Sequence, residues 1–171
     1  APEVYIEGSF RGHKAIPGTY ILKLSYGDKV LETASEIKNN PLYEISQEEF
    51  MAYDEFMSKA EKSYNEMTQM TNQLYEMQQK LTKVIGQLNA PGQAQLKSDA
   101  QTLLKELKAF DATMVQRLSK AYDDVENFEN GFTAHYLTAI NQTDSSIPKV
   151  TNGARSKMKE LNATWAGHKK T

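Results

Sequence analysis

The sequence predicts a mainly α-helical protein in which a short β-hairpin precedes an elongated antiparallel three-helix bundle. Three observations support this fold class. The segment before Pro41 alternates apolar and polar side chains with a period of two, as strands do. From residue 46 onward the apolar residues recur at steps of three and four, which is the period of a long helix. The sequence Ala90-Pro91-Gly92 then interrupts this repeat before it resumes, which indicates a helical hairpin.

The β-rich segment contains two clear strands and a weaker third one. Residues 19–26, TYILKLSY, put alternate apolar side chains on one face, and KVLETASEI follows directly after Gly27-Asp28. A two-residue turn that contains glycine is a strong hairpin signal, because glycine adopts positive φ without strain. Another strand is expected within EVYIEGSF, ending by Gly12. So small a sheet is marginal in water, and we therefore expect further strands or the helices to cover it.

The first long helix is expected over residues 46–89. Ser46 and Glu49 form a capping box, in which each side chain binds the backbone amide of the other residue. Thr71 and Gln78 interrupt an otherwise apolar seam. The residues expected to be buried against the second helix are Tyr53, Tyr64, Met67, Leu74 and Leu81.

The second helix is expected to begin between Gln93 and Asp99 and to carry an apolar seam from Leu96 to Val125. An interruption is expected at residues 127–131, followed by a short helix with Phe132, Tyr136 and Ile140. Thr151 or Asn152 can cap a last helix, which carries Met158, Leu161 and Trp165. We expect this last helix to cover the seams of the helical hairpin.

Composition excludes several classes of function. The 171 residues carry a net charge of -2, with 39% hydrophobic and 25% charged residues, so nothing in the overall charge points to nucleic acid. The chain has no cysteine, which excludes disulfides, thiolate zinc sites and thiol catalysis. No apolar run approaches the length of a membrane span.

No catalytic, cofactor-binding or metal-binding residue is predicted. His13, His135 and His168 are far apart in sequence and lack the spacing of metal ligands. Phosphate-binding loops, nucleophile elbows and calcium loops are absent from the sequence. A carboxylate pair for acid–base work on a sugar is conceivable among the acids of the first helix, but a solvated face is the simpler reading. These acids are Glu48, Glu49, Asp54, Glu55, Glu61, Glu66 and Glu76.

Two further groups of residues have both a structural and a functional interpretation. Methionines along the first helix can fill a core or line an adaptable groove, and core filling is the favoured reading; they are Met51, Met57, Met67, Met70 and Met77. Cations gather near the C-terminus and could contact phosphate, but few aromatic residues accompany them. These cations are Lys149, Arg155, Lys157, Lys159, Lys169 and Lys170.

The order of the segments resembles the C-terminal region of bacterial proteins that carry BNR-repeat, sortilin-like β-propellers and are often named glycosyl hydrolases. In that family an immunoglobulin-like domain ends in a P-G-T-Y hairpin, and a short linker leads to a helical hairpin and a final helix with a tryptophan. The matching residues are Pro17, Gly18, Thr19, Tyr20, Leu22, Leu24, Gly27, Pro41 and Trp165. Asn40 stands where the family usually has aspartate, and the P-T before the last helix is split into Pro148 and Thr151.

The resemblance implies that residues 1–41 are a partial immunoglobulin-like β segment and that residues 42–171 form the helical bundle. It also implies a secreted or periplasmic location and a larger parent protein whose propeller holds any glycosyl hydrolase-like activity. We therefore expect a non-catalytic accessory module that spaces or docks the propeller, with its parent chain or another protein as partner. The alternatives are an independent helical interaction or dimerisation module, and an enzyme of glycosidase type with an unrecognised site.

Overall fold

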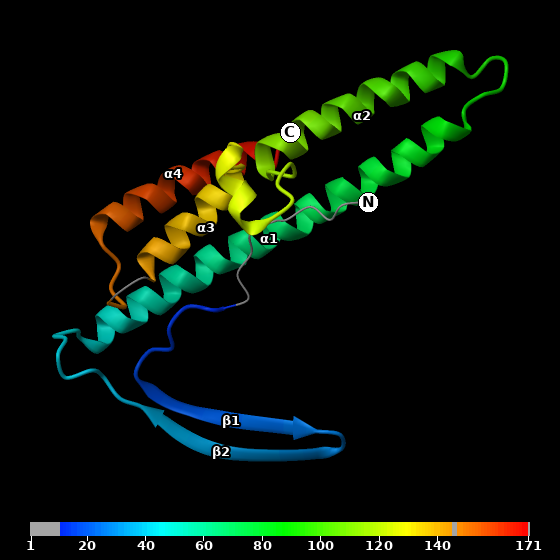
Figure 1. Ribbon diagram of the computed structural model, residues 1–171. Helices are drawn as coiled ribbons and strands as arrows, with labels where there is room; N and C mark the ends of the chain where they lie inside the picture. The colour runs from blue at the N-terminus through cyan, green and yellow to red at the C-terminus, as the bar shows by residue number, and fades with distance from the viewer. Residues whose placement is uncertain (1–10, 145–146, 171) are drawn as a thin grey trace. The chain divides into compact units, whose positions relative to one another are not determined.

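The computed structural model describes residues 11–144 and 147–170, and the strand expected within EVYIEGSF lies outside them. The described elements are two strands, four α-helices and a 3-10 helix, which follow one another along the chain as Figure 1 shows. The predicted fold class, a helical bundle preceded by a short β-hairpin, is confirmed. The elements are β1 (Gly18–Tyr26), β2 (Lys29–Ile37), α1 (Gln47–Gln87), α2 (Ala94–Met114), η1 (Tyr122–Asn127), α3 (Phe132–Thr143) and α4 (Asn152–His168).

The chain divides into two compact units that are nested in sequence. Among the described residues, the first unit is Lys62–Thr138, and the second combines Arg11–Glu61 with residues 139–144 and 147–170. The helices α1 and α3 therefore contribute residues to both units. Each unit is described by itself below.

The two strands form an antiparallel hairpin in the second unit. Tyr26 pairs with Lys29 next to the turn, and Gly18 pairs with Ile37 at the open end. Gly27 has a φ of 55°, whereas no residue other than glycine has positive φ in the described part of the chain. This is the pattern of a II′ turn, which takes glycine at its first central position and matches the twist of the strands. The hairpin predicted around Gly27-Asp28 is confirmed.

The start of α1 is determined by the predicted capping box. The Ser46 amide donates to Glu49 Oε2 at 3.1 Å, and the Glu49 amide donates to Ser46 Oγ at 3.2 Å. Two backbone donors that the helix leaves unsatisfied are thereby paired. At the other end, Gly92 with a φ of 89° makes the turn into α2.

The seam of α1 is buried most completely in its first half. Tyr53, Met57 and Met67 are fully buried, and Leu74 is 8% exposed. Tyr64 and Leu81, which were also expected to be buried, are only partly covered. The interruptions at Thr71 and Gln78 are buried too, and Gln78 Nε2 has no hydrogen-bond partner among the described residues.

The prediction that the seam of the second helix continues to Val125 is wrong, because α2 ends at Met114. Val115 is extended, with φ -137° and ψ 126°, and Leu118 is 65% exposed. The backbone of Gly131 lies against the end of the helix: a Cβ at residue 131 would stand 2.5 Å from the carbonyl oxygen of Met114. Thr133 Oγ1 donates to the same oxygen at 2.9 Å. The chain that returns after the 3-10 helix therefore packs directly against the end of α2.

An ion pair holds the chain just beyond the end of α2. Arg117 donates to both carboxylate oxygens of Asp111, at 2.6 and 3.0 Å, and to the Thr71 carbonyl at 3.3 Å. Its guanidinium also lies 4.7 Å from the ring centre of Tyr75. The carboxylate of Asp111 is buried, so this bidentate pair supplies the charge compensation that burial requires.

The helix α4 begins at Asn152 because Thr151 caps it, as predicted. Thr151 Oγ1 accepts from the amide of Ala154 at 3.1 Å. Met158, Leu161 and Trp165 recur at steps of three and four on this helix, and all three are buried. Within the described residues, no helix is both long and apolar enough to cross a membrane.

Candidate functional site

The hairpin has one apolar face. In an antiparallel pair, directly opposed residues project to the same side, and successive residues project to opposite sides. The register of the hairpin therefore puts Leu22 and Thr33 on one side with Leu24 and Leu31. We call this side the apolar hairpin face; its large apolar members are Tyr20, Leu22, Leu24, Tyr26, Leu31 and Ile37.

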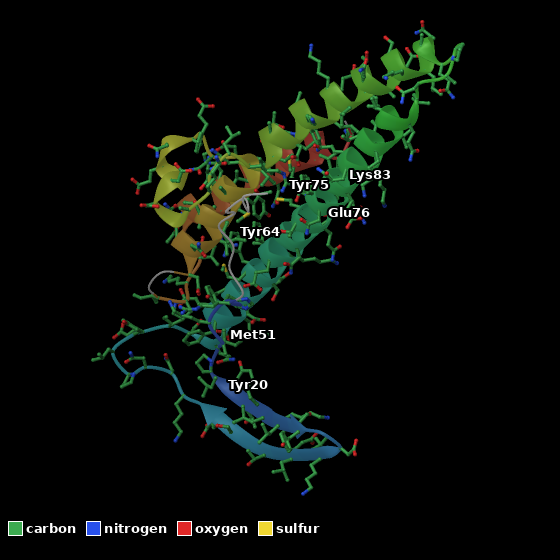
Figure 2. The ribbon with its side chains drawn as sticks, turned by 45° about the vertical axis from the view of Figure 1, so that its right-hand side comes forward. Tyr20, Met51, Tyr64, Tyr75, Glu76 and Lys83 are labelled. Atoms are coloured by element: carbon green, nitrogen blue, oxygen red, sulfur yellow. The ribbon has the colours of Figure 1, made fainter. Side chains whose placement is uncertain are left out.

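This face is open to solvent. Leu22 is 56% exposed, Leu24 65% and Leu31 68%, and Tyr26 is 84% exposed. Within the two strands, Tyr20 is the only residue that is partly covered. Its hydroxyl donates to the carbonyl of Ile16 at 2.7 Å. Residue 20, labelled in Figure 2, thus ties the first strand to the segment that leads into it. An isolated apolar face of this kind is typical of a sheet that packs on a partner.

The opposite face of the hairpin is mixed in character. Lys23 and Glu32 are directly opposed there, with 3.0 Å between Nζ and Oε1, beside the apolar residues Ile21 and Val30. The sheet contains two strands in the described residues, so the outer edge of each strand presents unpaired backbone groups. The hairpin therefore offers a partner an apolar side and two open edges.

A cluster of ionisable groups fixes the segment before β1. His13 Nε2 lies 3.0 Å from Asp54 Oδ1, and the His13 amide donates to Glu61 Oε1 at 2.7 Å. His13 Nδ1 lies 3.0 Å from Glu61 Oε2, which is within ion-pair distance but without the alignment of a hydrogen bond. Asp54 and Glu61 are seven residues apart on α1, so two helical turns bring both carboxylates to one face.

The two carboxylates also shift the pKa of His13. Burial lowers this pKa, but the interactions with Asp54 and Glu61 outweigh burial, so the pKa is raised above its ordinary value. The ring of His13 meets Tyr53 edge-on, with 5.7 Å between the ring centres. The sequence shows no metal-ligand spacing around His13, and the structure adds its two carboxylate partners. Only the seven-residue spacing of the acids could have indicated them.

Tyr53 and Asp144 extend this cluster. The hydroxyl of Tyr53 donates to Asp144 Oδ1, and burial together with the Asp144 carboxylate raises the pKa of Tyr53. The Lys14 amide donates to the same carboxylate oxygen at 3.3 Å, and its ammonium group donates to the Asp144 carbonyl. Tyr53 was expected to pack against the second helix; its ring meets His13 and its hydroxyl binds Asp144. Each of these groups has a structural partner, which is typical of a clamp between segments.

The other residues singled out in the sequence lie in different parts of the structure. His135 is exposed, and in the described residues no three histidine or acidic side chains are placed to hold a metal ion. Met57 and Met67 are core residues, whereas Met70 and Met77 are 37% and 50% exposed. Glu48 and Glu49 lie in the first turn of α1, where acidic side chains interact favourably with the positive end of the helix dipole.

Several C-terminal cations are engaged by neighbouring side chains. Lys149 pairs with Glu49 at 2.6 Å, and Lys157 pairs with Glu160 at 3.1 Å. The guanidinium of Arg155 lies 5.9 Å from the ring centre of Phe56. A cavity of about 470 Å³ opens beside these residues, lined by Ala139, Gln142, Thr143, Ile147, Lys149, Thr151, Gly153, Ala154 and Lys157. Its two cations already have carboxylate partners, so its lining offers no uncompensated charge for a ligand.

Comparison with known proteins gives no relative for this chain. No family model, no curated protein and no solved structure matches it.

Proposed function

We propose that this chain is a non-catalytic accessory module of a larger secreted or periplasmic propeller protein of glycosyl hydrolase-like type. The module docks on the rest of its parent chain through the apolar hairpin face and spaces it with the helical bundle. The observation that carries this proposal is the exposure of Leu22, Leu24 and Leu31 on one side of a regular hairpin.

The occupant of the apolar hairpin face is the opposing sheet of an immunoglobulin-like sandwich. Its strands alternate apolar and polar residues, as strands do when one face packs on a second sheet. If the helices of this chain covered Leu22 and Leu24, no further strands would be needed, but both residues are more than half exposed. A two-stranded hairpin is marginal in water, so added strands would stabilise it.

The small area of the apolar hairpin face favours a partner that also hydrogen-bonds to the open edges of the two strands. Strands of nine residues span about 30 Å, and two strands are about 10 Å wide, so the face covers roughly 300 Å². Burying this area alone would give an interface well below the roughly 1,200 Å² of a stable complex. Added strands that hydrogen-bond to the open edges supply the rest, and a covalent connection to the parent chain removes most of the entropic cost of association.

Docking in trans provides the test. The parent protein without residues 1–171 is mixed with this chain, and binding is measured by calorimetry. Leu22→Lys and Leu24→Lys should each weaken binding at least tenfold, because each puts an ammonium group into the apolar contact. Ile21→Lys is the matched control: Ile21 is 64% exposed on the same strand but lies on the other face. Equal losses for all three variants, or no loss for any, would overturn the docking mode.

The enzyme alternative has its own test. The isolated chain should show no glycosidase turnover on chromogenic sugars, because its carboxylates on α1 are exposed or engaged by basic groups. Robust turnover that survives purification and is lost on substitution of Asp54 or Glu61 would refute the non-catalytic assignment.

A further inference from the structure

One flank of the α1–α2 hairpin carries a second apolar face that does not take part in its seam. Met70, Met77 and Val84 recur every seven residues on α1, and Leu96 and Leu103 do so on α2. Their exposed fractions are 37%, 50% and 46% on α1 and 58% and 48% on α2. We call these five residues the tip face.

The two rows of the tip face lie on the same side of the helical hairpin. Each row precedes a seam row by one position: Met77 precedes the buried Gln78, and Leu103 precedes the partly covered Leu104. The helices run in opposite directions, as Figure 1 shows. Seen from one end of the hairpin, successive residues therefore advance clockwise around one helix and anticlockwise around the other. Rows that precede the seam in both helices therefore share one flank.

The other flank carries cations beside partly covered apolar residues. It forms a shallow hollow of about 350 Å³ lined by Thr82, Ile85, Gln101, Leu104, Lys105 and Lys108. Tyr75 stands on the same side of α1, where it meets Arg117; Figure 2 labels it with Glu76 and Lys83 along this part of the helix. The helical hairpin is therefore asymmetric, with cations on one flank and apolar side chains on the other.

The residues at the rims of the tip face carry complementary charges. On α1 the row next to it contains Gln73, Lys80 and Gln87, and on α2 the corresponding row contains Asp99 and Glu106. The side chain of Lys80 is 76% exposed, and its Nζ lies 3.8 Å from Glu76 Oε2. One rim is thus basic and the other acidic, so a rotated copy of this surface complements the original.

We propose that the tip face is a self-association surface, on which two copies of this chain form a four-helix arrangement. A two-fold axis parallel to the helices puts α1 of one copy against α2 of the other, with both turns at the same end. Lys80 then faces Asp99 of the second copy, and Met77 faces Leu103. The alternative two-fold axis would pair α2 with α2, which brings the acidic rims together and is disfavoured.

The area makes this a weak interaction. From Met70 to Val84 the face is about 21 Å long at 1.5 Å per residue, and two helices are about 20 Å wide. Two such faces bury on the order of 800 Å², which is at the low end for protein–protein contacts. Dissociation constants on the order of 100 µM to 1 mM are therefore expected for the isolated chain, and association becomes substantial where copies are held close together.

Cross-linking tests the geometry directly, because the chain has no cysteine of its own. Met77→Cys and Leu103→Cys are prepared separately in the full chain. Mixed under mild oxidation, they should give a disulfide-linked heterodimer in large excess over either homodimer. Glu76→Cys is the control for random collision, since the side chain at residue 76 is 67% exposed on the same helix but points away from the tip face. Preferential Met77→Cys homodimers would overturn the proposed axis, and cross-linking no faster than with the control would overturn self-association.

Sedimentation over a range of concentrations gives an independent measurement. The unmodified chain should show a rising weight-average mass toward 1 mM, and Leu103→Lys should abolish the rise while leaving helical circular dichroism unchanged. Lys80→Glu should weaken association several-fold, and Lys80→Glu combined with Asp99→Lys should restore it. A constant monomer mass up to 1 mM, or failure of the charge exchange to restore association, would refute the proposal. Leu22→Lys in the β-hairpin should leave the rise intact, so this test is separate from that of the docking proposal.

Discussion

The buried helices and the exposed hairpin use their apolar residues in opposite ways. On α1, the side chains of Tyr53 and Met57 are fully buried by this chain alone, so they stabilise its fold without a partner protein. On the hairpin, Leu24 and Leu31 are directly opposed but both are about two-thirds exposed. An alternating pattern shows which face is apolar, but it does not show whether the same chain covers that face.

The largest effect should come from the helical side of this comparison. Met57→Ala should lower the free energy of unfolding by about 2–5 kcal/mol, because it removes a fully buried side chain and leaves a cavity. Urea denaturation followed by helical circular dichroism measures this loss. Met51→Ala is the matched control on the same helix, since Met51 is 60% exposed, and it should change stability by less than about 0.5 kcal/mol. Similar losses for both variants would contradict the burial described for α1.

Next in size is the close backbone approach at the end of α2. Gly131→Ala should destabilise the protein by about 1–3 kcal/mol, because the new methyl group would meet the Met114 carbonyl and the Val115 amide. Gly86→Ala is a suitable control, because a Cβ at residue 86 has nothing within 4 Å and alanine favours the helix. The same urea titration distinguishes the two variants. Gly131→Ala should lower the free energy of unfolding, and Gly86→Ala should raise it slightly. Tolerance of alanine at residue 131 would mean that α2 ends for another reason.

A smaller effect should follow pH through His13. The folded pKa of His13 is raised above the unfolded value, so its stabilising contribution is complete below the unfolded pKa of about 6.5. That contribution is lost as pH rises through the folded pKa. Between about pH 5.5 and about pH 8, the unmodified chain should lose about 0.5–1 kcal/mol more than His13→Gln, a magnitude typical of partly exposed ion pairs. Asp54, Glu61 and the ring of Tyr53 contact the imidazole, and Lys14 is the next residue along the chain. The opposite sign of the difference would show that burial, not the carboxylates, controls the histidine.

The smallest effect is expected on the apolar hairpin face. Leu24→Thr should change the stability of the isolated chain by less than about 0.5 kcal/mol, because leucine at residue 24 is already 65% exposed and threonine favours strands. Thermal unfolding of the isolated chain provides the measurement. A loss of 2 kcal/mol or more would break the comparison, since it would show that Leu24 is buried within this chain after all.

The elements of the fold were largely predictable because their signals are local. The capping box at Ser46, the glycine turn at Gly27 and the cap at Thr151 each involve residues within three positions of one another. The end of α2 could not be predicted in the same way. Apolar spacing continues past Met114, but the helix ends where Gly131, distant in sequence, packs against its last residue. Local patterns describe what a segment can form, whereas long-range contacts decide where it ends.

The candidate surfaces were predictable only in part. The alternation of residues 19–26 indicated an apolar sheet face, and the structure added that nothing in the described residues covers Leu22 or Leu24. The tip face was not predicted from the sequence, because core filling was the favoured interpretation of Met70 and Met77. The partners of His13 were missed because the pairing joins residues 41 and 48 positions apart.

The hydrogen bonds between Lys14 and Asp144 join residues 130 positions apart, which has a consequence for biosynthesis. A ribosome that adds about 5–20 residues per second needs roughly 7–26 seconds between making the first of these residues and the last. During this interval Lys62–Thr138 can fold as a nested unit. The segment around His13 cannot form its contact with Asp144 until that residue has been synthesised. Synthesis of the C-terminal helices, not of the long first helix, is therefore the step that completes the second unit.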